Sequence, residues 1–296
     1  MGELAAGVAM FAMMLAMGLT LGADDFRRVV RAPRPAIVGT LLQLVILPSI
    51  GIFIARAFSL PPLLTAGLVV LAGCPGGLFS NMFVHVARAH TALSITLTAT
   101  ATLATLFTLP LLVRFALAGS EGAGQTVEMP ILDTAFQLGM LTVFPVGVGM
   151  LLLTRFPRAG RWEPTISRVS IVSILIIVGL RSLDQPESPA DEFARSVIPV
   201  AWYTLSAVLI GTLVPGLVGI SARDSATIAL ELAVKNTMLG IVLLTQVVEF
   251  VAIVPILVYM IVQIPIGIAI LVGWRMLARY GWVAPISSEP ARQKES

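Results

Sequence analysis

The chain has 296 residues, of which 57% are hydrophobic and only 12% charged, and its formal net charge is +3. Soluble domains carry about 25% charged residues, so this composition, with a mean hydropathy of +0.96, excludes an ordinary soluble domain and indicates an integral membrane protein. The small positive charge requires no nucleic-acid partner, because cytoplasmic loops of membrane proteins are rich in Lys and Arg, and the single cysteine excludes an intrachain disulfide.

Apolar segments of about 20 residues, the length that an α-helix needs to cross a bilayer, recur along the whole chain. The first lacks the basic region and cleavage site of a signal peptide, so we expect a retained helix. We predict an all-α membrane protein with one transmembrane domain at 1–280 and a disordered cytoplasmic tail at 281–296. The nine predicted spanning segments are Glu3–Leu21, Pro35–Ala57, Leu63–Ala87, Thr91–Ala118, Pro130–Thr154, Thr165–Leu183, Phe193–Gly219, Ala226–Val248 and Val251–Leu277.

The loop charges predict the orientation. Of the 19 Lys and Arg residues, 14 fall on one side of the predicted segments and four on the other, and the remaining one, Lys235, lies inside a segment. The basic side of such a protein usually faces the cytoplasm. We therefore expect a multi-pass protein of the cell inner (plasma) membrane, with the N-terminus outside and the C-terminus in the cytoplasm.

Two segments contain interruptions. Gly73-Cys74-Pro75-Gly76-Gly77 lies in the middle of one apolar run, where Gly and Pro should break a helix. Glu231–Thr237 interrupts a second segment that enters the membrane from the opposite side. Interrupted segments in corresponding places of two inverted halves point to a secondary transporter and its binding site.

Glu231 and Lys235 are the only ionisable residues deep inside a predicted segment. On an intact helix their spacing would place them on one face. They form either a structural ion pair or, as such residues more often do, part of an ion pathway, with Glu231 as a cation ligand or proton carrier. Hydroxyl and amide oxygens that could join Glu231 around a monovalent cation come from Ser80, Asn81, Ser94 and Thr98. The alternative for the hydroxyls is a hydrogen bond to their own helix.

Several motifs resemble the bile acid:sodium symporter family. Cys74-Pro-Gly-Gly-Leu-Phe-Ser-Asn81 is similar to its CPGG-x-x-SN signature. Further similarity lies at Met17–Leu21, at Asp25-Phe26, in the Gln43–Pro48 stretch and at Glu231 with Asn236. The resemblance to the nine-helix form implies an inverted-repeat fold with two discontinuous crossing helices, a core (35–118 and 193–277) and a panel (3–21 and 130–183).

The resemblance also implies binding residues. One sodium site would use Ser80, Asn81, Ser94, Thr98 and Glu231. A second would use Gln43, Glu231, Leu232, Val234 and position 235, where the family has glutamine and this chain has Lys235. Because an ammonium cannot donate an oxygen and repels sodium, we expect Lys235 to occupy the second site, contacting Glu231 and Gln43 in place of the ion. The substrate would contact Leu78, Phe79, Ser80, Asn236 and Thr237.

The resulting prediction is a symporter that imports an organic anion of the bile-acid or small-carboxylate type with sodium, by alternating access, through one sodium site. We expect no enzyme activity, no organic cofactor, and no partner besides substrate, sodium and the lipid bilayer. A proton-coupled carrier or an efflux pump of the arsenite or auxin type is one alternative. A non-transporting membrane sensor is another.

Overall fold

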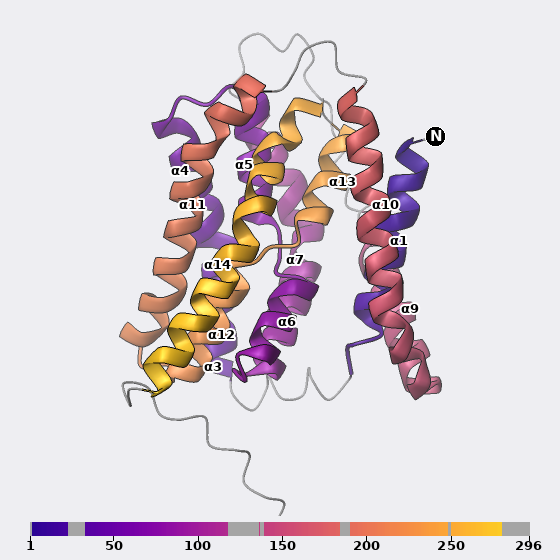
Figure 1. The fold of residues 1–296 in the computed structure, drawn as a ribbon, viewed down its shortest axis with the longest axis vertical. Coiled ribbons are helices and arrows are strands. Elements are labelled where there is room, and N and C mark those ends of the chain that lie inside the picture. The colour runs from indigo at the N-terminus through magenta and orange to yellow at the C-terminus, as the bar shows by residue number, and fades with distance from the viewer. Residues whose placement is uncertain are drawn as a thin grey trace, which may run out of the picture.

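The computed structural model describes residues 2–22, 33–117, 136, 139–183, 190–247 and 250–279, and within these ranges the regular structure is helical (Figure 1). The predicted tail and the start of the predicted segment Pro130–Thr154 lie outside the described residues. In chain order the helices are α1 (Gly2–Gly18), α3 (Pro33–Leu41), the π-helix η1 (Leu42–Ile46), α4 (Leu47–Ala57), α5 (Pro62–Gly73), α6 (Leu78–Val86), α7 (Thr91–Leu117), α9 (Val143–Arg155), the 3₁₀-helix η2 (Pro157–Trp162), α10 (Glu163–Leu183), α11 (Ala190–Leu217), α12 (Ala222–Ala233), α13 (Thr237–Val247), the 3₁₀-helix η3 (Phe250–Ile253) and α14 (Val254–Arg279).

Several helices have the length and composition of membrane spans. Pro33–Ala57, Pro157–Arg181, Ala190–Leu217 and Phe250–Met276 each qualify alone, and α7 qualifies when its two parts are joined across a 59° bend. The bend lies one turn before Pro110, whose ring clashes with the carbonyl four residues earlier and so kinks the helix. Large apolar side chains on the outer faces are exposed, as a lipid-facing surface requires. The chain is a multi-pass membrane protein.

The helices pack in two groups. In Figure 1, α1, α9 and α10 lie together at one side, and α1 packs against both others. Gly18 and Gly149 allow the close approach of α1 and α9, since a Cβ on either would collide with the backbone of the other helix. In the larger group α11 packs on α12 and α14, and α5 packs on α4, α7 and α14.

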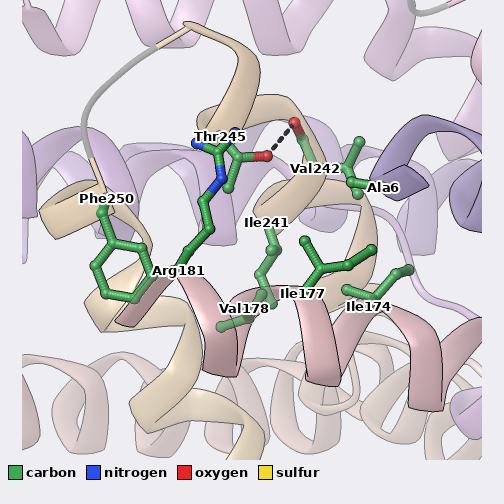
Figure 2. Close-up of a pocket in the computed structure, with 9 residues that line it drawn as sticks. All are labelled: Ala6, Ile174, Ile177, Val178, Arg181, Ile241, Val242, Thr245 and Phe250. Atoms are coloured by element: carbon green, nitrogen blue, oxygen red, sulfur yellow. Dashed lines mark hydrogen bonds between the residues drawn. The ribbon is translucent and has the colours of Figure 1, made fainter. Parts of the chain in front are cut away.

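The two groups meet through α1 and α13. Figure 2 shows a narrow pocket in this region, where apolar side chains of α1 and α10 face those of α13 and η3. Its polar members are Arg181 and Thr245, and the Thr245 hydroxyl donates to the Val242 carbonyl at 3.0 Å. The contact at this end of the molecule, the upper end in Figure 1, is therefore mostly apolar.

Both interruptions predicted from the sequence are helix breaks. The first chain segment runs from α5 in the upper half of Figure 1 to α6 in the lower half, and the second runs the opposite way, from α12 to α13. The breaks touch one another, because Gly76 and Lys235 form an antiparallel bridge and the Asn236 amide donates to the Pro75 carbonyl at 2.8 Å. Two extended stretches from distant parts of the chain thus meet between four helix ends.

Backbone groups freed by the breaks find partners within the protein, as they must in a membrane. The Ala233 carbonyl, at the end of α12, accepts a hydrogen bond of 2.7 Å from the Tyr259 hydroxyl. The Cys74 carbonyl accepts one of 3.0 Å from the Lys235 ammonium. These buried bonds stabilise the non-helical backbone at the point where the two breaks meet.

Candidate functional site

Oxygen atoms from α6 and α7 surround the carboxylate of Glu231, which is fully buried near the end of α12. Its Oε2 accepts a hydrogen bond of 2.8 Å from Ser94 of α7, and its Oε1 accepts one from Thr98, one turn further along α7. Asn81 of α6 joins the cluster through a 2.6 Å contact between its Oδ1 and the Ser94 hydroxyl. Four of the five residues predicted for the first sodium site are therefore in direct contact.

The cluster has more acceptors than protons. The single hydroxyl proton of Ser94 cannot serve both Asn81 Oδ1 and Glu231 Oε2. Carboxylate, amide and hydroxyl oxygens together are the donor set of hard cations, whereas transition metals prefer nitrogen or sulfur. One carboxylate among neutral oxygens suits a cation of single charge.

Ser80, the fifth predicted residue, borders the same space. Its hydroxyl donates to the Gly77 carbonyl at 2.7 Å and accepts from the Gly77 amide at 2.9 Å, closing the first turn of α6. A Cβ built on Gly76 would lie 3.0 Å from Ser80 Oγ and would collide with Glu231 Oε1. The absence of a side chain at Gly76 therefore leaves the room that the Glu231 carboxylate occupies.

No hydrogen bond joins the side chains predicted for the second cation site. Gln43 is fully buried in the π-helix, a feature frequent at functional sites, yet neither polar atom of its side chain has a hydrogen-bond partner. Leu232 and Val234 are buried beside the break. The ammonium of Lys235 donates to the Cys74 carbonyl, and no hydrogen bond joins it to Gln43 or Glu231.

This difference has a local cause. The predicted contact assumed an intact helix, in which Glu231 and Lys235 share one face. However, α12 ends at Ala233, and Val234 is extended, with φ −127° and ψ 104°. The change of backbone direction aims Lys235 at the other break instead of back along α12.

A pocket separates the breaks from α1 and α10. The predicted substrate residues Phe79, Asn236 and Thr237 line it, together with Lys235. Ser80 does not, and the side chain of Leu78 lies outside the described residues. The cavity measures about 20 Å³, room for about one water molecule. An organic substrate would need α1 and α10 to move away from the breaks.

The opposite wall of this pocket was hard to predict from the sequence. Met13, Met14 and Met17 of α1 form it with Ile171 of α10. The three methionines are buried, and methionine in an apolar helix is usually adaptable packing. Only their recurrence along one helix, at a spacing that keeps them on neighbouring faces, could have indicated a wall.

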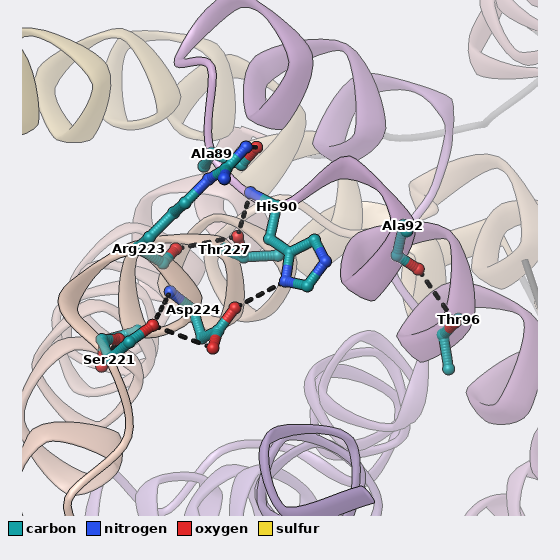
Figure 3. Close-up of polar contacts among 9 residues, drawn as sticks. Ala89, His90, Ala92, Thr96, Ser221, Arg223, Asp224 and Thr227 are labelled. Carbon is teal, nitrogen blue, oxygen red and sulfur yellow. Dashed lines mark hydrogen bonds and ion pairs between the residues drawn. The ribbon is translucent and has the colours of Figure 1, made fainter. Parts of the chain in front are cut away.

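A polar network joins the turn after α6 to the start of α12 at the lower end of the molecule (Figure 3). His90 Nδ1 lies 2.7 Å from Asp224 Oδ1, and the His90 amide donates to Thr227 Oγ1 at 2.9 Å. Arg223 donates to the Ala89 carbonyl at 3.2 Å, and Ser221 caps α12 by accepting from the Asp224 amide at 3.1 Å. The network fixes the two lower half-helices to each other.

The same network predicts a pH dependence. Burial raises the pKa of Asp224, but hydrogen bonds from His90 and Ser221 and the charges of His90 and Arg223 outweigh it and hold the pKa below its ordinary value of 3.8. A lowered pKa means that the carboxylate stabilises the fold above pH 3.8 and ceases to do so as the pH falls through the folded-state value. We expect Asp224→Asn to lower the melting temperature of the detergent-solubilised protein by a few degrees at pH 7, with the difference from wild type shrinking below pH 3.8. Asp191→Asn, at an exposed position of α11, is the control. A pH-independent difference would contradict this assignment.

The amino-acid sequence is similar to a known protein family and to several known proteins. Residues 7–185 match the sequence profile of the Sodium Bile acid symporter family, a range that includes α6 and α7 but ends before Glu231. The chain is 29% identical over 234 residues to the "Probable sodium/metabolite cotransporter BASS1, chloroplastic" of Arabidopsis thaliana, covering 79% of this chain and 57% of that protein. It is 28% identical over 235 residues to the "Uncharacterized sodium-dependent transporter YocS" of Bacillus subtilis (strain 168), covering 78% and 71%. It is 27% identical over 231 residues to the "Ileal sodium/bile acid cotransporter" of Homo sapiens, covering 76% and 64%. The chain thus spans little more than half the length of the Arabidopsis protein.

Proposed function

The chain belongs to the sodium bile acid symporter family, and from that premise we propose that it is a secondary active transporter that imports an organic anion together with sodium. The names of its relatives describe sodium-dependent carriers, among them carriers of metabolites and bile acids, and support this class. The observation that carries the proposal is the buried oxygen cluster of Glu231, Ser94, Thr98 and Asn81 at the meeting point of the two helix breaks.

Sodium binds at this cluster and is held there by one carboxylate and neutral oxygens. Bound sodium accepts electron pairs from Glu231 and Asn81 at once, which removes the competition for the single Ser94 proton. It thereby ties α6, α7 and α12 together. The ammonium of Lys235 repels a second cation near Gln43. We therefore assign one sodium ion to each transport cycle.

The substrate binds in the pocket between the breaks and α1. The positive dipole end of α13 lies beside the pocket residue Asn236, and an anionic group is stabilised there. The helices α1, α9 and α10 act as a panel against which the remaining core helices rock, with the two oppositely directed broken segments as inverted repeats. The protein lies in the plasma membrane with its basic end on the cytoplasmic side.

Uptake into proteoliposomes tests this function. Labelled carboxylates are offered with a sodium gradient and a pH gradient imposed separately, and we expect uptake only with sodium outside. Uptake driven by the pH gradient alone would favour the proton-coupled carrier, and outward movement would favour the efflux pump. Binding without net flux under either gradient would favour the membrane sensor.

The single-sodium assignment predicts a gain of stoichiometry on removing the ammonium. Lys235→Gln supplies an amide oxygen where the wild type has a positive charge, so a second sodium should bind beside Gln43. Equilibrium binding of radioactive sodium to the purified protein, without substrate, should rise from one ion to two per chain. Lys235→Met, which removes the charge but adds no oxygen, should still bind one. An unchanged stoichiometry in Lys235→Gln would refute the assignment.

A further inference from the structure

Lys235 is a buried cation with unused binding capacity. Its side chain is 1% exposed, and its ammonium forms one hydrogen bond within the described part of the chain, to the Cys74 carbonyl at 3.0 Å. An ammonium has three donors, so two are unused. Within the described part of the chain, no carboxylate forms an ion pair with it. Buried charges are normally paired, and this one has no partner of opposite charge in direct contact within the described residues.

The surroundings of Lys235 combine polar donors with an apolar wall. It lines the small pocket beside Asn236 and Thr237, which begin α13. Thr237 Oγ1 already accepts a hydrogen bond of 3.4 Å from Gln263, which leaves its own proton to donate. On the other side the pocket is closed by three methionines of α1, with Phe79 and Ile171. One end of the pocket thus suits an anionic group and the rest suits hydrocarbon.

We propose that the Lys235 ammonium binds the carboxylate of the transported substrate, and that the substrate is a monocarboxylate with an apolar body. This inference rests on the proposed function and identifies the group that selects its cargo. The carboxylate takes the two unused donors of Lys235 and the hydroxyl proton of Thr237. The apolar body replaces the adaptable methionine side chains as α1 and α10 withdraw.

The charges of the loaded site favour a substrate with a single negative charge. Glu231 with one bound sodium is neutral, so the Lys235 ammonium is the uncompensated charge of the loaded site. A single carboxylate neutralises it, whereas a neutral molecule leaves a buried positive charge and a dianion creates a buried negative one. The loaded carrier therefore moves one sodium ion with one monoanion, and transport carries no net charge.

Ligand pairs that differ only in charge test the proposal. The purified full-length protein is titrated, at saturating sodium, with hexanoate and phenylacetate and with the neutral hexanamide and phenylacetamide, and thermal stabilisation is measured. We expect each acid to bind at least about tenfold more tightly than its amide, the factor that corresponds to 1.4 kcal/mol. Lys235→Met should lose this preference, and Lys235→Arg should keep it. Stabilisation by sodium alone should persist in all three proteins.

The outcomes separate this inference from the proposed function. The role of Lys235 would be overturned if the acid bound no better than its amide, or if the preference for the acid survived in Lys235→Met. Sodium-dependent stabilisation would be unaffected by either result. Loss of sodium-dependent stabilisation in the wild type would instead overturn the sodium site. A second measurement does not depend on any variant. Hexanoate uptake into proteoliposomes should not respond to an imposed potassium diffusion potential, and acceleration by that potential would contradict the balanced charge.

Discussion

Glu231→Gln should weaken sodium binding by at least about 100-fold and abolish sodium-driven uptake, because removing one charge of a buried, compensated pair costs about 3–5 kcal/mol. The carboxylate supplies the one negative charge of the cluster that it forms with Ser94, Thr98 and Asn81. Its neutral amide keeps the size of the side chain but offers one acceptor in place of two. Sodium-dependent thermal stabilisation of the purified protein measures the affinity, and proteoliposome uptake measures the coupling.

Neighbouring hydroxyls of α7 provide graded variants and a matched control. Ser94→Ala and Thr98→Ala should each weaken sodium binding by about tenfold, the effect of losing one ligand. Thr102→Ala should not, because Thr102, one turn further along α7, donates to the Thr98 carbonyl of its own helix at 2.7 Å. Sodium affinity at the wild-type level in Glu231→Gln would refute the site. An equal loss in Thr102→Ala would show that the effect comes from packing of α7.

The position of the first helix break was predictable because its cause is local. Pro75 and three glycines cluster in the middle of an apolar segment, and such a cluster interrupts a helix. The structure ends α5 at Gly73 for this reason. The grouping of Ser94 and Thr98 with Glu231 was also predictable. The two hydroxyls lie one turn apart on an intact part of α7, where the helical period sets their direction.

The direction of Lys235 was not predictable from spacing. The rule that places residues four apart on one face applies only within a helix, and α12 ends two residues before Lys235. Beyond that point the side chain follows the partner that tertiary structure provides, the Cys74 carbonyl 161 residues away in the chain. The pairing of His90 with Asp224, 134 residues apart, depends on tertiary packing in the same way.

Gly76→Ala should nearly eliminate sodium binding while leaving the fold intact. A Cβ at this position would collide with Glu231 Oε1, the end of a side chain that can rotate away, whereas no backbone atom is among its nearest contacts. The carboxylate is therefore displaced from Ser94 and Thr98, and the fold is destabilised by only about 1–3 kcal/mol, the usual cost of one extra methyl in a packed site. We expect sodium affinity to fall by about 10- to 100-fold. The melting temperature without sodium should fall much less than in a core-disrupting variant.

Gly147→Ala is the matched control for this substitution. Gly147 lies in α9, and a Cβ there meets no atom within 4 Å, so alanine should stabilise the helix by about 0.5–1 kcal/mol and leave sodium binding unchanged. The contrast between the two variants separates a steric effect on the carboxylate from the general effect of replacing glycine.

The double variant Gly76→Ala/Glu231→Gln tests whether the added methyl group acts through the carboxylate. If the methyl group acts through the carboxylate, the double variant should bind sodium no worse than Glu231→Gln alone, because the two substitutions remove the same interaction. A further loss in the double variant would mean that Gly76 holds sodium by a route independent of Glu231.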